Sequence, residues 1–265
     1  MALQNLLDLS QRGQKIGLSE ERVKDMIPVG RQYLSFWRDY PDLFIDFMSQ
    51  GTTFRLYYYQ RVFLRGVMRS KYFYGVFPRA YSKSFLSTLI LMVRCILYPR
   101  AKLFVTSGGK EQSAGIIKDK VQEICQLIPA FEREIDYGRG KTLLGKDYVR
   151  IVFKNDSYFD NIAANEKSRG KRRHGFVGEE CVGIDGKILS EVLIPITNIS
   201  RLLPDGTKDH KEKLNKSQVM ITTAGYKNTF AKTQKFVGEL KPREPLDRGV
   251  NIEIYLLIVK VYNNR

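Results

Sequence analysis

The sequence predicts an α/β fold in which a mostly parallel sheet is flanked by helices. Short β-prone runs alternate along the chain with longer runs that carry apolar residues at helical spacing, which is typical of parallel strands joined by helical crossovers. Several β-prone runs end in small or charged residues, and sheets of this kind bind ligands at the carboxyl ends of their strands. A chain of 265 residues can bury a sizeable core.

The predicted elements follow one another from the N-terminus. Residues 1 to about 50 are expected to be helical, with Ser19 offering a helix cap before two glutamates. The most apolar run, residues 85–98, is expected to be a buried helix, because Arg94 interrupts it and it is too short to span a bilayer. The remaining expected elements are strands at 72–77, 101–105, 149–153, 175–178 and 219–222, a helix at 112–127, and polar loops at 166–174 and 203–217.

The composition indicates a polyanionic partner. The formal net charge is +16, and an excess of Lys and Arg at this level favours nucleic acid, with a membrane surface or simple solubility as the alternatives. The three cysteines are far apart and the chain has only two histidines, which argues against a structural zinc site or a disulfide framework and favours a reducing compartment. The N-terminus lacks the apolar core of a secretory signal.

A Lys-Ser pair, Lys83-Ser84, opens the helix that follows the strand at 72–77. At such a helix start, backbone N–H groups cradle phosphates, the Lys reaches the β and γ oxygens, and the Ser hydroxyl ligates Mg²⁺. The strict pattern G-x-x-x-x-G-K-[ST] fails twice, because Phe77 and Ser82 occupy its two glycine positions. A solvated Lys is the alternative, although a Lys here opposes the helix dipole and so favours a nearby anion.

A second candidate phosphate loop is rejected. Residues 140–142 read Gly-Lys-Thr, but Ile135 stands where the first glycine is required and no strand immediately precedes the segment.

Two acidic residues, Glu179 and Glu180, follow the strand at 175–178. One carboxylate can hold Mg²⁺ and its neighbour can polarise an attacking water, a division of labour that suits phosphoryl transfer. A pair of exposed acids in a turn is the alternative interpretation.

Two further features support the same chemistry. Gln60 lies upstream of the Lys-Ser loop, and its amide can donate to and accept from an adenine edge, unless it is an ordinary surface residue. Thr222, Thr223 and Ala224 follow another strand, where small hydroxyl residues can contact a γ-phosphate or the attacking water, unless they form only a structural turn.

With these features in this order, the chain resembles the ATPase domain of the large terminase subunit of tailed bacteriophages, the motor that packages DNA. The resemblance covers most of residues 30–230, and its specificity lies in the order and spacing of the motifs together. The similar segments are residues 36–44 (lid segment), Tyr59-Gln60 (adenine motif), 78–84 (a deviant Walker A loop with an Arg before the Lys), 106–112 (after the second strand), 168–170 (Arg-Gly loop), Glu179-Glu180 (Walker B and catalytic Glu) and 222–224 (coupling motif).

The resemblance implies a P-loop NTPase fold of the ASCE/RecA-like class with an N-terminal helical lid. The implied division is a lid at 1–50, the ATPase domain at 51–240, and an extension at 241–265 to which no role is assigned. A C-terminal nuclease domain and nuclease activity are not expected. Two departures from the family pattern stand out: Ser82 replaces the usual Gly, and Glu179 replaces the usual Asp.

The resemblance also implies roles for individual residues, with ATP and Mg²⁺ as cofactors. Glu180 would activate water, Arg79 would act in cis on the γ-phosphate, and Arg169 would act as an arginine finger in a neighbouring subunit. Ser84 and Glu179 would organise Mg²⁺. The nucleotide-binding set is Gln60, Pro78, Arg79, Ala80, Tyr81, Ser82, Lys83, Ser84 and Phe85, the coupling set is Thr222, Thr223 and Ala224, and the DNA-binding set is Lys167, Lys171, Arg172 and Arg173.

The implied activity is Mg-dependent ATP hydrolysis that powers translocation of double-stranded viral DNA into a procapsid. The implied assembly is a homo-oligomeric ring with portal and small terminase subunit partners, without a membrane, in the cytoplasm of an infected bacterial host. Two alternatives stay open. One is a helicase-like translocase, for which 265 residues leave no room for a second motor domain. The other is a nucleic-acid-binding module with an inactive P-loop.

Overall fold

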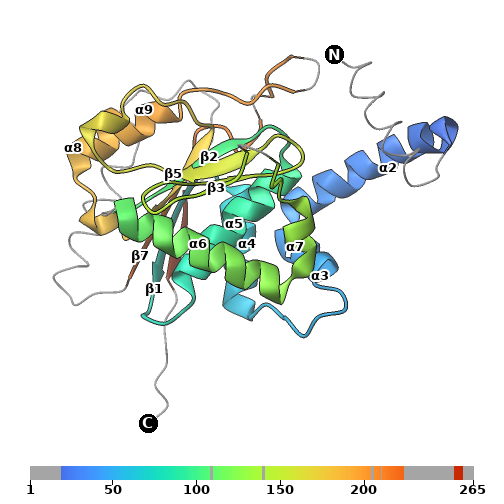
Figure 1. Ribbon diagram of the computed structural model, residues 1–265, viewed down its shortest axis with the longest axis horizontal. Helices are drawn as coiled ribbons and strands as arrows, with labels where there is room; N and C mark the ends of the chain where they lie inside the picture. Colours follow the sequence, from blue (N-terminus) through green and yellow to red (C-terminus); the bar gives the residue numbers. More distant parts are fainter. Residues whose placement is uncertain are drawn as a thin grey trace, which may run out of the picture.

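The computed structural model describes residues 19–107, 110–138, 141–203, 206–209, 211–223 and 254–258. Within them, one eight-stranded sheet has the strand order β3-β4-β5-β2-β6-β7-β1-β8. Figure 1 shows the sheet among its surrounding helices. The strands are β1 (Tyr72–Phe77), β2 (Lys102–Thr106), β3 (Leu143–Leu144), β4 (Val149–Val152), β5 (Tyr158–Asn161), β6 (Gly175–Glu179), β7 (Ser217–Thr223) and β8 (Ile254–Ile258).

The sheet is mostly parallel, as the sequence predicts. The pairs β5–β2, β2–β6, β6–β7, β7–β1 and β1–β8 are parallel. The strands β3 and β4 instead pair antiparallel, and so do β4 and β5. A tight turn joins β4 to β5, and Asp156 enters the left-handed region there (φ 63°), a conformation that Asp tolerates better than most residues. The antiparallel edge is a feature that the sequence reading did not anticipate.

The predicted helical elements are present within the described residues. The longer helices are α2 (Glu20–Asp39), α3 (Pro41–Met48), α4 (Tyr58–Arg69), α5 (Lys83–Leu97), α6 (Lys110–Leu127) and α7 (Pro129–Glu134). The shorter elements are η1 (Glu166–Ser168), η2 (Cys181–Gly183), α8 (Gly186–Ile188), η3 (Leu189–Leu193) and α9 (Ile194–Ile196). Residues 1–18 of the expected N-terminal helical segment lie outside the described residues.

Period-two alternation along the strands divides the core into two layers. Phe73 of β1 belongs to the larger apolar cluster, with α3 to α7, whereas the next residue, Tyr74, belongs to a smaller cluster with η2, η3 and α9. The same alternation separates Leu103 from Phe104 on β2. Helices therefore cover both faces of the sheet, as parallel strands require.

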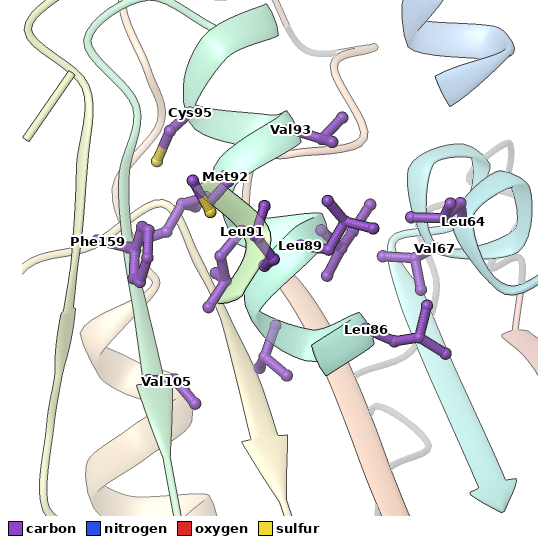
Figure 2. Packing of buried hydrophobic residues seen from close by; sticks show 14 of the residues in the cluster. Leu64, Val67, Leu86, Leu89, Leu91, Met92, Val93, Cys95, Val105 and Phe159 are labelled. Atoms are coloured by element: carbon purple, nitrogen blue, oxygen red, sulfur yellow. The ribbon is translucent and has the colours of Figure 1, made fainter. Parts of the chain in front are cut away.

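Helix α5 is the central helix of the larger layer, and nearly all of its residues are buried. Figure 2 shows Leu86 and Leu89 of α5 close to Leu64 and Val67 of α4. This burial agrees with the expectation of a buried helix at 85–98.

The charged residue inside this apolar helix, Arg94, is almost completely buried. Its Nη1 donates to Ser217 Oγ (3.0 Å) and its Nη2 donates to the carbonyl of Val67 (2.7 Å). Burial lowers the pKa of the Arg94 guanidinium to about 10. Arg94 thus joins the C-terminal half of α5 to the start of β7 and to α4.

The N-terminal helix α2 is anchored at its C-terminal end. Arg38 donates through Nε (3.1 Å) and Nη2 (2.8 Å) to the carbonyl of Leu97 and lies over the Tyr98 ring at 4.1 Å. Trp37 packs against Phe44 of α3. From this anchor α2 projects away from the sheet (Figure 1), so its position depends on a few contacts near residue 38.

Strand β8 falls within the range 241–265 that the sequence sets apart as an extension. It adds to the sheet beside β1 in parallel register, with Tyr72 opposite Ile254 and Val76 opposite Ile258. In the part of the chain that the structure describes, no helix is both long and apolar enough to cross a bilayer.

Candidate nucleotide-binding site

Three predicted motifs meet at the carboxyl edge of the sheet. Strand β1 ends at Phe77 and is followed by residues 78–82 and then by α5. Strands β6 and β7 end at Glu179 and Thr223. Because β6 and β1 both pair with β7, with Glu179 opposite Ile221 and Phe77 opposite Thr223, the three strand ends are neighbours. The order β6-β7-β1 is not the order along the chain, and it brings residues more than 90 positions apart within hydrogen-bonding distance.

Lys83, the first residue of α5, lies between two of these strand ends. Its Nζ donates to Glu180 Oε1 and to Thr223 Oγ1. Thr223 Oγ1 in turn donates to Glu180 Oε1 (2.6 Å), and the Thr223 backbone N–H donates to Oε2 (3.3 Å). Lys83, Glu180 and Thr223 therefore form a closed polar cluster.

The charge state of Glu180 follows from these contacts. Partial burial alone would raise its pKa, but the hydrogen bonds and the positive charge of Lys83, together with the bonds from Thr223, outweigh burial and lower the pKa below its usual range. Glu180 is ionised at neutral pH, which suits a group that orients or deprotonates water.

Glu179 has a different environment. Its side chain is 7% exposed, and burial raises its pKa, against the opposing hydrogen bond from Ser87. Ser87 Oγ donates to Glu179 Oε1, and Ser84 Oγ lies 3.4 Å from Oε2. The two adjacent glutamates therefore have pKa values shifted in opposite directions, a pattern typical of sites that assign different roles to two carboxylates.

Ser87 is a site residue that the sequence reading missed. It lies three positions after Ser84, so both side chains lie on the same face of α5. That spacing was the available signal, but a Ser within an apolar helical run gives no indication of its own that it contacts an acid from another strand.

The loop before Lys83 shows how a chain without the family's glycines forms this turn. Ala80 (φ 64°) and Ser82 (φ 48°) both adopt left-handed backbone conformations, and Ser82 is also the N-cap of α5. A non-glycine residue in this region costs on the order of 1–2 kcal/mol. Ser82 thus adopts the kind of conformation for which a glycine is usually chosen, and strain of this size is commonly kept at functional sites.

Gln60 lies close to the loop through its aromatic neighbour. It is buried at the first turn of α4, where its Oε1 accepts from the backbone N–H of Tyr57 (2.9 Å) and its Nε2 lies 3.5 Å from the Tyr59 hydroxyl. The Tyr59 ring packs against Tyr81 of the loop, with 5.4 Å between ring centroids. Gln60 therefore closes the start of α4 beside the loop, and its role at an adenine edge stays a prediction.

The two arginines that were assigned catalytic roles differ in their contacts. Arg79 is exposed, and within the described residues its guanidinium makes no hydrogen bond or ion pair. Arg169 is also exposed, and it pairs with Glu166 (2.5 Å) and Glu191 (3.3 Å). Neither the cis role of Arg79 nor the trans role of Arg169 is tested by this geometry.

Other members of the predicted sets are placed as follows. Phe85 is buried and packs against Phe54, so only its backbone is available to a ligand. Pro78 and Tyr81 are half-buried, and Ala80 is exposed. Ala224 lies outside the described residues.

The predicted DNA-binding loop divides in two. Lys167 and Arg172 are exposed. Arg173 instead turns inward: it forms an ion pair with the buried Asp160, with Nε to Oδ1 at 3.1 Å, and lies 5.1 Å from the Tyr158 ring. Its guanidinium is therefore committed to the fold rather than presented to solvent.

The donor set around Glu179 suits a hard divalent cation. The described residues contain no group of three or more His, Cys, Asp or Glu side chains that could hold a metal. Mg²⁺, however, is commonly held by one or two protein oxygens together with waters and substrate phosphates. The Glu179 carboxylate and the Ser84 hydroxyl supply oxygens of that kind.

Comparison with solved structures identifies the fold. The crystal structure of the HK97 bacteriophage large terminase matches with a TM-score of 0.51 at 10% identity, over 83% of this chain and 44% of that one. The chain has the fold of a phage large terminase. This similarity confirms the expected P-loop NTPase fold.

Two further structures match this terminase fold at lower scores. They are the large terminase ATPase domain of Thermus phage P74-26 (TM-score 0.49, 15% identity, 77% of this chain and 81% of that one) and the large terminase of a thermophilic bacteriophage in complex with ADP (TM-score 0.47, 10% identity, 77% and 45%). The chain spans less than half of the HK97 protein and less than half of the ADP-bound terminase. No protein-family model matches the sequence, and neither does any curated protein.

Proposed function

We propose that this chain is a Mg-dependent ATPase, the motor domain that moves double-stranded viral DNA into a procapsid in the host cytoplasm. The observation that carries the proposal is the meeting of Lys83, Ser84, Glu179, Glu180 and Thr223 at the carboxyl edge of the sheet. A phosphate-binding Lys, a hydroxyl, two carboxylates and a small polar residue on a neighbouring strand are the parts that phosphoryl transfer needs.

The proposed roles divide between the two sides of the site. The backbone of residues 78–82 and the ammonium of Lys83 bind phosphate oxygens, while Ser84 and Glu179 hold Mg²⁺. When bound, Mg²⁺ neutralises charge on the phosphate oxygens. Glu180, ionised at neutral pH, orients the attacking water and accepts its proton.

Lys83 can pair either with Glu180 or with a bound phosphate, so the site has two arrangements. When Lys83 binds a phosphate, Glu180 loses its ion pair and becomes a stronger hydrogen-bond acceptor for water. Thr223 contacts both residues, so it is placed to communicate this exchange to β7, in keeping with the proposed coupling role of residues 222–224.

The remaining assignments are part of the same proposal. Gln60 contacts the adenine edge, and Arg79 acts on the γ-phosphate within the subunit. Arg169 is exposed, as a group that reaches a neighbouring subunit of a homo-oligomeric ring must be. Portal and small terminase subunit partners are proposed from the family resemblance.

The experiment that tests the proposal measures Mg·ATP hydrolysis over a range of protein concentrations. The parent should gain specific activity as concentration rises, Glu180→Gln should lose at least ~100-fold at every concentration, and Arg169→Ala should lose the concentration dependence. Arg133→Ala, which removes an exposed arginine of α7 that has no assigned role, is the matched control. If Glu180→Gln hydrolyses ATP like the parent, the proposed catalytic role is wrong. DNA binding without turnover in the assembled parent would favour the binding-module alternative.

A further inference from the structure

The opposite edge of the sheet, where the parallel strands begin, carries a row of basic residues. Lys102 opens β2, His174 precedes β6, Lys216 precedes β7, and Lys71 precedes β1. Backbone hydrogen bonds join them in sheet order: His174 N–H to the Lys102 carbonyl (2.7 Å), and Lys216 N–H to the His174 carbonyl (2.6 Å). On the β1 side, Gln218 N–H donates to the Lys71 carbonyl (2.9 Å).

The sheet order fixes the length of this row. The strands β2, β6, β7 and β1 are consecutive neighbours, and neighbouring strands are about 4.8 Å apart, so Lys102 and Lys71 start about 14 Å apart. The row is distinct from the nucleotide site, because β1 alone places about 16 Å between its first residue, Tyr72, and its last, Phe77.

The charge of these lysines is not neutralised by acids in the fold. Within the described residues, the ammonium groups of Lys71, Lys102 and Lys216 (the amino-edge lysines) form no ion pair. Burial lowers the pKa of Lys71, and the positive charges of Lys216 and Lys213 lower it further. Like charges held together in this way destabilise a fold, so stability does not explain the cluster.

Two carboxylates near this edge are already committed to other partners. Glu212 forms a buried ion pair with Arg201, and Asp160 pairs with Arg173. His174 adds no positive charge at neutral pH, because burial and the nearby charge of Lys102 lower its pKa to about 4. The edge therefore presents lysine ammonium groups that these two acids do not neutralise, which is the electrostatic pattern of a surface for a polyanion.

We propose that the amino-edge lysines bind the phosphodiester backbone of double-stranded DNA, at a surface separate from the nucleotide site. A row of about 14 Å matches roughly four base-pair steps of the duplex axis, at about 3.4 Å each, so it is long enough to contact several phosphates. Arg172, two positions before His174, is also exposed and adds a further cation close to the start of β6. The choice of DNA as the polyanion rests on the proposed function. The inference adds the surface at which the motor domain binds the duplex.

The test is binding of a fluorescently labelled 20-base-pair duplex, followed by anisotropy from low to high salt. The variant is Lys71→Gln, Lys102→Gln and Lys216→Gln together. The matched control removes the same charge from exposed lysines elsewhere: Lys118→Gln, Lys146→Gln and Lys187→Gln. Loss of three phosphate contacts should weaken binding on the order of 100-fold at 0.1 M salt and reduce the log–log salt slope by about 3, whereas the control should stay near the parent.

Folding and activity of the same proteins separate the outcomes. The amino-edge variant should unfold at the same temperature as the parent or higher, because it loses repulsion, and its DNA-free ATP hydrolysis should be unchanged. Equal affinity and salt slope in the variant and the control would overturn the inference, and so would a parent that does not bind the duplex. A parent that binds DNA through these lysines but hydrolyses no ATP would overturn the proposed function and leave this surface in place.

Discussion

Ser87 of α5 donates a hydrogen bond to the carboxylate of Glu179 at the end of β6, although 92 positions separate the two residues. The terminase pattern that the sequence resembles usually has Asp at the position of Glu179. Glu is longer by one methylene, and its carboxylate extends beyond Ser84 to the next hydroxyl along the helix. Ser87 therefore accommodates the longer acid and orients the oxygen that faces Ser84.

This hydrogen bond predicts that Ser87→Ala weakens Mg²⁺-dependent nucleotide binding. The Glu179 carboxylate loses a charge-assisted hydrogen bond, which is worth roughly 1.5–3 kcal/mol, so the Mg²⁺ concentration for half-maximal nucleotide binding should rise about tenfold or more. Ser87→Thr, which keeps the hydroxyl, should need a Mg²⁺ concentration close to that of the parent. The measurement is Mg²⁺-dependent binding of a fluorescent ATP analogue.

A double-mutant cycle with Glu179→Asp sharpens the test. A shorter acid does not reach Ser87, so Ser87→Ala should have little additional effect in the Glu179→Asp background. Fully additive effects would show that Ser87 acts on the fold rather than through Glu179.

Thr223→Val should impair turnover more than nucleotide binding. The substitution keeps the shape of the side chain but removes the hydroxyl that contacts both Lys83 and Glu180. We expect kcat to fall about tenfold while KM changes little, since hydrogen bonds to charged groups are worth on the order of 1.5–3 kcal/mol. Thr223→Ser, which keeps the hydroxyl, serves as the control, and an equal loss in both variants would contradict the role of the hydroxyl.

Ser82 should tolerate glycine but not valine. Glycine adopts the left-handed conformation of Ser82 without a Cβ penalty, so Ser82→Gly should retain ATP turnover. A β-branched residue is poorly suited to this conformation, so Ser82→Val should distort the loop and reduce turnover at least tenfold. Steady-state hydrolysis by both variants decides the question. Similar rates in Ser82→Val and the parent would mean that the left-handed turn is not needed.

His174 should make the fold sensitive to acid. Its pKa is lowered from 6.5 to about 4 by burial and by the charges of Lys102, Arg201 and Arg173, so the unfolded chain binds the proton more readily than the folded one. The stability that neutral His174 contributes is fully present above pH 6.5 and is lost as pH falls toward 4. The loss is about 3 kcal/mol, at 1.36 kcal/mol per pKa unit.

The measurement for His174 is chemical denaturation at pH 7.5 and pH 5 in the parent and in His174→Asn. The amide oxygen of Asn can accept from the Lys102 N–H in place of the imidazole Nδ1, which accepts it at 2.9 Å. The free energy of unfolding should fall less between the two pH values in the variant. An identical fall would assign the acid sensitivity to other groups.

The sequence predicted those parts of the site that local patterns specify. Glu179-Glu180 lies at the end of one β-prone run, and Lys83-Ser84 follows another after the short loop 78–82, so their placement at a sheet edge followed from parallel strands. Ser87 could not be found in the same way. It lies on α5 and its partner Glu179 lies at the end of β6, and only the strand order brings these two elements together.

Strand direction and side-chain pairing set the other limits. Alternation at 149–153 predicts a strand but not its direction, so the antiparallel β4 was not foreseen. Arg173 reads as one more cation in a basic loop until Asp160 of β5 is placed beside it. The row of amino-edge lysines likewise depends on the non-sequential order β2-β6-β7-β1, which brings Lys71, Lys102 and Lys216 to one edge.

The central claim is that the turn before α5 is a working phosphate loop, with Lys83 as its cation. Its most direct test is Mg·ATP hydrolysis by the parent beside Lys83→Ala, at a protein concentration high enough to favour assembly. We predict clear turnover in the parent that disappears in Lys83→Ala. Equal rates in the two proteins, at a concentration where the parent is assembled, would contradict the claim.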